Sequence, residues 1–193
     1  MSSQEVKYPS FENRSRKIAI TLVAFALLGG WIVYMLWASR IGLRTVLMPS
    51  IPEWTTYIAI GCVVGLVFAC RGVLRGGGGR TLKRAMDAFF GWFCVGFACS
   101  IQGYDVAAYL LPGDTVHYES AYEISFPGPA LGKLSRCEAG VWIKDVTTER
   151  WIQLCTNKAD LNDQIQPGMT AVRVTAHANK VGSYIVGYQF IYQ

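Results

Sequence analysis

The chain has 193 residues, of which 52% are hydrophobic and only 16% charged, and its formal net charge is +5. Soluble domains usually carry about 25% charged residues, so the composition argues against a wholly soluble protein. Residues 1–112 hold 11 basic and 5 acidic side chains, and residues 113–193 hold 7 and 8. A nucleic-acid-binding protein concentrates positive charge on its folded soluble part, and this distribution excludes that class.

The first predicted membrane span is the uncharged run of residues 18–38, which follows a predicted cytoplasmic tail of residues 1–17. About 21 helical residues at 1.5 Å each cross a hydrocarbon core of roughly 30 Å. A cleaved signal peptide is the alternative. Its apolar core would have only 7–15 residues, and no A-x-A cleavage site follows this run. We therefore expect a retained anchor.

Two further spans are predicted at residues 54–74 and 87–111. A short periplasmic loop, residues 39–53, precedes them, and a cytoplasmic loop rich in glycine and arginine, residues 75–86, joins them. Their uncharged cores of about 17 residues lie at the short end of the spanning range. One of them could instead be a buried helix of a soluble protein. Three such runs close together leave too little polar sequence to cover them in water.

The orientation of the spans follows from the distribution of basic residues. Nine lysines and arginines lie before the first span or between the second and third, and only Arg40 and Arg44 lie between the first and second. Such residues resist transfer across the membrane, so the amino terminus and the 75–86 loop are expected in the cytoplasm. Three crossings then place the residues after Pro112 in the periplasm.

The stretch RGVLRGGGGRTLKR, residues 71–84, resembles a phosphate-binding loop only in its glycines. It lacks both G-x-x-x-x-G-K-[ST] and G-x-G-x-x-G, and an apolar span rather than a strand precedes it. We interpret it as a flexible connection. Its basic residues are expected to set the topology and to contact anionic lipid head groups; they are Arg71, Arg75, Arg80, Lys83 and Arg84.

Small residues one helical turn apart predict close packing between the spans. Gly61 and Gly65 form a GxxxG pair in the second span, and Gly96 and Ser100 have the same spacing in the third. Small residues let helix backbones approach closely in lipid. We expect them to pack helices of one chain, with oligomerisation as the alternative. No Lys, Arg, Glu or His lies centrally in a span, which argues against a transporter or channel made by one chain.

From residue 112 the sequence becomes rich in β-branched and aromatic residues separated by turn signals. Strands are expected at residues 114–126, 140–146, 150–156, 169–178 and 183–192, with a short helix at 158–165. The tetrapeptide at 179–182 is typical of a hairpin connection. The predicted fold is an α+β membrane protein, in which three transmembrane helices precede a five-stranded antiparallel barrel or sandwich at residues 112–193.

Cys137 and Cys155 are predicted to form a disulfide. If the hairpin of residues 140–156 has its loop centred on Val146, the two cysteines lie directly opposite and Trp142 nearly faces Trp151. Disulfides persist in oxidising compartments such as the periplasm. Two reduced thiols are the alternative, and a zinc site is not expected without a CxxC pair.

The sequence offers no combination of residues typical of catalysis. His117 and His177 are the only histidines, and neither accompanies a nucleophile motif such as G-x-S-x-G. Glu119 and Glu123 share one face of a predicted strand, but nothing nearby makes them an acid–base pair. We expect no enzyme, no cofactor and no metal.

The leading interpretation is a non-enzymatic inner-membrane protein of bacteria that presents its β-domain to the periplasm for protein–protein contact. It would serve as a subunit of an envelope assembly or as an immunity-type protein, with the bilayer and a protein as partners. A small-ligand sensor and an oligomeric pore or transporter component are the alternatives. A eukaryotic secretory membrane would satisfy the same physical constraints.

Overall fold

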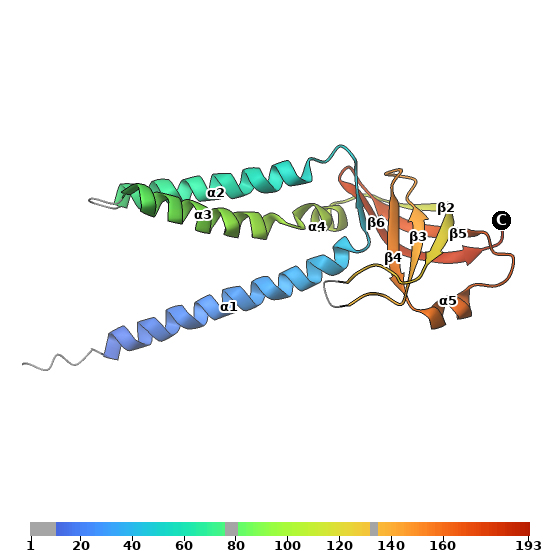
Figure 1. Ribbon diagram of the computed structural model, residues 1–193, viewed down its shortest axis with the longest axis horizontal. Coiled ribbons are helices and arrows are strands. Elements are labelled where there is room, and N and C mark those ends of the chain that lie inside the picture. Colours follow the sequence, from blue (N-terminus) through green and yellow to red (C-terminus); the bar gives the residue numbers. More distant parts are fainter. Residues whose placement is uncertain (1–10, 76–80, 132–134) are drawn as a thin grey trace, which may run out of the picture. The chain divides into compact units, whose positions relative to one another are not determined.

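The computed structural model describes residues 11–75, 81–131 and 135–193. Contacts between residues divide the chain into two units, Met1–Ala38 and Ser39–Gln193. Part of the predicted cytoplasmic tail, the four consecutive glycines and Arg80 lie outside the described residues. The first unit consists of most of helix α1 (Phe11–Gly42), and the second holds every other element in Figure 1.

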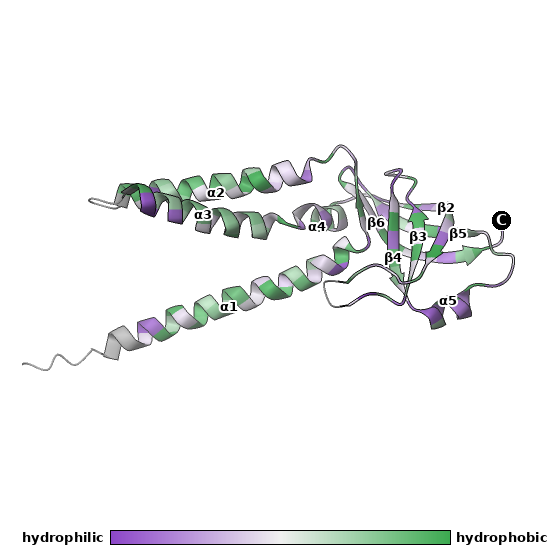
Figure 2. Cartoon of the chain, in the orientation of Figure 1, coloured by the Kyte–Doolittle hydropathy of each residue, from purple (hydrophilic) through white to green (hydrophobic). Residues whose placement is uncertain are grey.

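The helices of the second unit are α2 (Glu53–Arg75), α3 (Thr81–Ser100) and α4 (Gly103–Leu110). Figure 1 shows α2 and α3 side by side and antiparallel. Within the residues that the structure describes, three segments are long and apolar enough to cross a membrane by length and composition, namely Ser15–Gly42, Glu53–Leu74 and Leu82–Leu110. Figure 2 shows the apolar character of these helices. The prediction of three such helices is thus confirmed at the level of composition.

The third candidate span is not one continuous helix. Between α3 and α4, Gln102 adopts a left-handed conformation with φ of 69°. This conformation ends the α3 hydrogen-bond pattern, and glycine at 103 is a poor helix former. The final two turns therefore form the separate helix α4, which packs against the β-domain.

The β-domain is a nearly closed, barrel-like antiparallel sheet of six strands in the described chain. The strands are β1 (Thr45–Leu47), β2 (Asp114–Ser125), β3 (Ala139–Lys144), β4 (Trp151–Thr156), β5 (Ala171–Ala178) and β6 (Gly182–Ile191). Their spatial order is β1-β6-β5-β2-β3-β4. Helix α5 (Lys158–Gln164) connects β4 to β5. Five strands and the short helix lie where the sequence predicted them.

The sixth strand, β1, was not predicted. It comes from the loop between α1 and α2 and pairs antiparallel with the start of β6, Thr45 opposite Tyr184 and Leu47 opposite Gly182. Three residues carry too little periodicity to be recognised as a strand. They become one because the hairpin of β5 and β6 offers them an edge. The predicted count of five strands is therefore wrong.

The core of the barrel follows the two-residue alternation of its strands. Side chains from every long strand meet inside, and α5 adds the buried Leu161. The buried cluster comprises Ala139, Val141, Ile143, Leu154, Leu161, Val172, Val174, Ile185 and Phe190. Burying each large aliphatic side chain contributes about 1.5–3 kcal/mol. The barrel interior is thus a packed apolar core.

Candidate functional site

The two ends of the sheet, β1 and β4, leave a line of incomplete strand pairing that we call the seam. Within the described chain, β4 pairs only with β3, and β1 covers only Gly182–Tyr184 of β6. The seam is therefore bounded by β4 on one side and by β1 and residues 186–191 of β6 on the other. Alternate backbone N–H and C=O groups of an edge strand point away from its neighbour.

Side chains cross the seam where backbone pairing is missing. The Arg150 guanidinium donates from Nη1 to the Leu47 carbonyl oxygen at 3.2 Å, which links the start of β4 to β1. At the other end, the Thr156 side chain of β4 is close enough to the Tyr188 phenol of β6 to lower its pKa and so oppose the effect of burial. These contacts hold the sheet edges near one another without completing a ladder.

A fully buried carboxylate, Asp145, anchors the inner side of the barrel near β1. Its Oδ2 accepts from the backbone N–H of Thr148 at 2.8 Å and from the Thr148 hydroxyl at 2.7 Å. Its Oδ1 accepts from the Tyr118 hydroxyl at 2.7 Å and the Ser183 hydroxyl at 3.0 Å. Four donors compensate the loss of water around the carboxylate. Asp145 thereby ties the β3–β4 turn to β2 and β6.

The same turn positions Arg150. The backbone N–H of Asp145 donates to the Arg150 carbonyl oxygen at 2.9 Å, so the carboxylate and the guanidinium are set by one local structure. One residue thus organises the inside of the barrel, and the other reaches β1 across the seam. We infer that the turn of residues 145–150 holds the barrel closed at this end.

Tyr118 and Tyr188 lie beside these contacts, and both have raised pKa values that favour their neutral forms. Burial raises the pKa of Tyr118, and the hydrogen bond to Asp145 and its charge raise it further. Burial also raises the pKa of Tyr188. A neutral phenol can donate, and this is what the bond from Tyr118 to the Asp145 carboxylate requires.

We expect the β-domain to lose stability in alkaline solution. The folded pKa values of Tyr118 and Tyr188 exceed the unfolded value of 10.0, so the unfolded chain releases protons first as pH rises. Their contribution is complete below about pH 10 and declines above it. Thermal unfolding between pH 8 and 11.5 measures the decline, which Tyr118→Phe should flatten while Tyr192→Phe leaves it unchanged. An equal slope for all three proteins would contradict the assignment.

Exposed apolar side chains occupy both strands of the seam. Trp151, the first residue of β4, is 47% exposed, and Val186 in β6 is 58% exposed. Val186 is the extra residue of a β-bulge opposite Thr175 and Ala176, and bulges re-aim side chains and end regular pairing. Its carbonyl lies 3.5 Å from Nη1 of Arg44. The seam therefore combines open backbone groups, apolar side chains and two arginines.

The predicted disulfide is present, but its predicted register is wrong. Cys137 and Cys155 are bonded with their Cα atoms 5.6 Å apart. Cys155 lies opposite Gly140, however, and Trp142 lies opposite Gln153 rather than near Trp151. The hydrogen-bonded turn of residues 145–150 shifts the hairpin centre toward the carboxyl terminus.

Cys137 lies before β3, in a segment that folds back on itself. Its N–H donates to the Pro129 carbonyl oxygen at 3.0 Å, and its own carbonyl accepts from Gly128 at 2.9 Å. The disulfide thus links this segment covalently to β4. It does not join directly opposite positions of the β3–β4 hairpin.

The glycines predicted to pack helices lie between α2 and α3. A Cβ atom at Gly65 would come within 2.8 Å of the Phe89 carbonyl oxygen, and one at Gly61 within 3.0 Å of the Phe93 ring. From α3, a Cβ at Gly96 would come within 2.9 Å of Val64. The Ser100 hydroxyl donates to the Phe97 carbonyl within its own helix at 2.8 Å. The three glycines permit the close approach of these two helices.

We expect Gly65→Ala to weaken the pairing of α2 with α3 by about 1–3 kcal/mol, the usual cost of overpacking. The new methyl group would meet a backbone carbonyl, which cannot rotate away. Gly72→Ala is the matched control, since a Cβ atom there meets nothing within 4 Å. Resistance to unfolding by a denaturing detergent measures the effect. Equal resistance of the two variants would contradict this packing.

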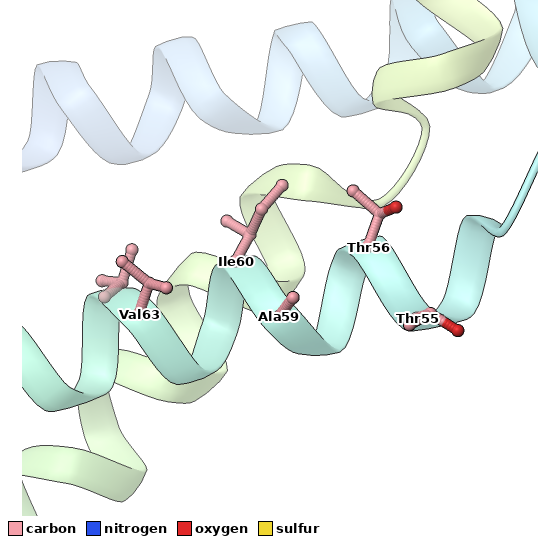
Figure 3. Close-up of a pocket in the computed structure, with 6 residues that line it drawn as sticks. Thr55, Thr56, Ala59, Ile60 and Val63 are labelled. Carbon is pink, nitrogen blue, oxygen red and sulfur yellow. The ribbon is translucent and has the colours of Figure 1, made fainter.

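Within the described residues, two hollows lie along α2. Figure 3 shows the first, about 360 Å³, lined by Thr55, Thr56, Ala59, Ile60, Val63 and Val64. The Thr56 hydroxyl is already bonded to the Pro52 carbonyl oxygen and lies 2.9 Å from the Tyr104 hydroxyl. The second hollow, about 350 Å³, lies between α2 and α3 and is lined by Phe68, Arg71, Gly72, Ala88 and Trp92.

The remaining residues singled out from the sequence are dispersed. Arg71, Lys83 and Arg84 are exposed near facing ends of α2 and α3, and the Arg75 side chain is outside the described part. His117 Nδ1 lies 3.1 Å from Thr175 Oγ1, and His177 Nε2 lies 3.0 Å from the Leu111 carbonyl oxygen. Glu119 pairs with Arg173 at 3.0 Å, and Glu123 is exposed.

No group of three His, Cys, Asp or Glu side chains that could hold a metal ion occurs among residues 11–75, 81–131 and 135–193. Comparison with protein-family models, with curated proteins and with solved structures finds no significant match for this chain.

Proposed function

We propose that this protein is a non-enzymatic, membrane-anchored interaction protein of the bacterial envelope. Its three apolar helices cross the inner membrane with the amino terminus in the cytoplasm, and the β-domain lies in the periplasm. The seam is the surface through which the β-domain contacts a partner protein. The assignment rests mainly on one observation, the incomplete strand pairing along β4 and β6 beside exposed Trp151 and Val186.

An incompletely paired strand edge supports binding by strand addition. An extended partner segment gains main-chain hydrogen bonds from the edge and specificity from side chains that flank it. Exposed aromatic residues are frequent anchors of such contacts. The Arg150 side chain bridges the seam through the Leu47 carbonyl oxygen. It uses few of the backbone groups of the seam, so the edge keeps hydrogen-bonding capacity.

The packed interior favours this function over a small-ligand sensor. A sensor of the barrel type would hold its ligand inside, yet Val141, Ile143, Val172, Val174 and Ile185 are each at most 1% exposed and fill that space. Tyr118, Tyr122 and Tyr188 pack against the same cluster. We therefore assign the contact with a partner to the outer surface of the barrel and not to its interior.

The topology is tested by labelling a single cysteine with an impermeant reagent in intact spheroplasts. Gln193→Cys is introduced into a chain whose free cysteines, Cys62, Cys70, Cys94 and Cys99, are replaced by serine. We expect labelling without lysis. Labelling only after lysis would place the β-domain in the cytoplasm and overturn the topology.

The seam is tested by photo-crosslinking in living cells. A photoreactive phenylalanine replaces Trp151 or Gln189 at the seam, or His117 on β2 as a control exposed on the outside of the barrel. We expect a discrete adduct of the same mass from both seam positions and none from His117. Adducts of equal yield from all three positions would argue against the seam as the contact surface.

A further inference from the structure

The second hollow on α2 combines an aromatic wall, an open space and a cation. The rings of Phe68 and Trp92 stack with centroids 3.7 Å apart and an interplanar angle of 10°. Gly72 leaves the space beside them empty, because a Cβ atom at that position meets nothing within 4 Å. Arg71 lines the same hollow of about 350 Å³ and is exposed.

Arg84 places a second positive charge near the hollow. It precedes the lining residue Ala88 by four residues, or about one helical turn, so it lies on the face of α3 that lines the hollow. Lys83 is the neighbouring residue of Arg84 and is also exposed, but its position is rotated about 100° from that of Arg84 around the helix axis. Asp87 is the acidic residue of this turn and is also exposed, within reach of Lys83 and Arg84 at helical spacing.

We propose that this hollow binds one anionic phospholipid, with its phosphate between Arg71 and Arg84 and an acyl chain along Phe68 and Trp92. A guanidinium binds phosphate oxygens through two parallel N–H groups. The aromatic wall and the space at Gly72 accept hydrocarbon. This inference rests on the membrane insertion proposed above, and it adds a lipid ligand to that function.

The occupant is a lipid and not free phosphate because of where the hollow lies. Its residues belong to two segments apolar enough to cross a membrane, and Arg71 stands three residues before the end of the first, Leu74. The proposed topology places this end at the cytoplasmic leaflet, where anionic lipids attract basic residues by about 1 kcal/mol each. The hollow in Figure 3 has no charged residue in its lining and is expected not to select among head groups.

The test measures binding of short-chain lipids to the purified full chain in a neutral detergent. The probes are dihexanoyl phosphatidylglycerol, dihexanoyl phosphatidylcholine and inorganic phosphate. We expect phosphatidylglycerol to bind at least about fivefold more tightly than phosphatidylcholine, since one basic contact contributes about that factor. Arg71→Gln should remove the preference, and Gly72→Leu should weaken binding of both lipids by filling the space.

Two matched variants separate this site from general charge or helix effects. Lys83→Gln removes the same charge from another face of α3, and Gly91→Leu adds the same side chain where a Cβ atom meets nothing within 4 Å. Both should bind like the parent chain. Equal losses in Arg71→Gln and Lys83→Gln, or binding of inorganic phosphate as tight as that of phosphatidylglycerol, would overturn the lipid site.

Failure of the lipid site can be distinguished from failure of the proposed membrane anchoring by two separate measurements. Extraction of cell membranes with alkaline carbonate reports whether the chain is integral, and labelling of Gln193→Cys reports its orientation. A chain that remains integral with the proposed orientation but shows no head-group preference would refute only the lipid site. A chain extracted by carbonate would refute the membrane anchoring itself.

Discussion

Replacing Asp145 with alanine is expected to lower the free energy of unfolding of the β-domain by about 3–5 kcal/mol, which places it among the most damaging single substitutions. The side chain is fully buried and accepts four hydrogen bonds. Its removal leaves the donors of Tyr118, Thr148 and Ser183 without their acceptor and opens a cavity among them.

The isosteric change Asp145→Asn separates hydrogen bonding from volume. Asparagine places an NH₂ group at the position of one of the two carboxylate oxygens. There the NH₂ group would face hydrogen-bond donors from which it cannot accept. We expect a loss of about 2 kcal/mol. Glu123→Gln is the control, since Glu123 is an exposed carboxylate of β2 and surface substitutions usually change stability by less than about 0.5 kcal/mol.

Thermal and denaturant unfolding of the purified full chain, followed by the near-ultraviolet signal of its aromatic residues, measures both changes. A loss below about 1 kcal/mol for Asp145→Ala would show that the carboxylate does not hold the barrel together. If the alanine variant does not accumulate, the asparagine variant still reports the contribution of the hydrogen bonds. A second readout is photo-crosslinking at Trp151, because loosening the turn that carries Arg150 should change seam contacts.

Replacing both Cys137 and Cys155 with serine is expected to destabilise the β-domain by about 3 kcal/mol, within the range of 2–5 kcal/mol for small exported domains. The bond closes a loop with a sequence separation of 18, and on the chain-entropy model it acts by restricting the unfolded state. The segment before β3 would also lose its covalent link to β4. Chemical unfolding of the oxidised, reduced and double-serine chains measures the effect.

The control for the disulfide is the set of four free cysteines in the helices. Replacing Cys62 by serine should leave the stability difference between oxidised and reduced chain unchanged. Thiol counting after denaturation checks the pairing in cells, since the chain has six cysteines and four are free in the structure. Six reactive thiols in freshly isolated membranes would contradict an oxidising location of the β-domain.

Local patterns predicted much of the architecture. The apolar runs are continuous over whole helices, so their length alone identifies segments able to cross a membrane. The strand-forming residues of MTAVRVTAHA placed β5 correctly, and its two-residue alternation matches the burial of Val172 and Val174 in the core. The same alternation, continued past Val141 and Ile143 in β3, places Asp145 inside the barrel. The sequence prediction missed the buried carboxylate although this signal is present.

Contacts between distant residues were not predictable in the same way. The seam depends on Arg150 reaching Leu47 over a separation of 103 residues, and the buried network on Ser183 reaching Asp145 over 38. No local periodicity in the sequence predicts either of these two contacts. The hairpin register failed for a related reason, because the hydrogen bonds of Thr148 to Asp145 decide the length of the turn.

By itself, the sequence determined three apolar helices, the positions of five strands and the residues able to form the disulfide. Each is a property of neighbouring residues, whose hydrophobicity and conformational preference act over one or two turns. Only the tertiary structure decided that β1 joins the sheet, that the barrel remains open along one seam and that a hollow forms beside Arg71. These depend on which surfaces meet after folding, and that is decided by the packing of the whole unit.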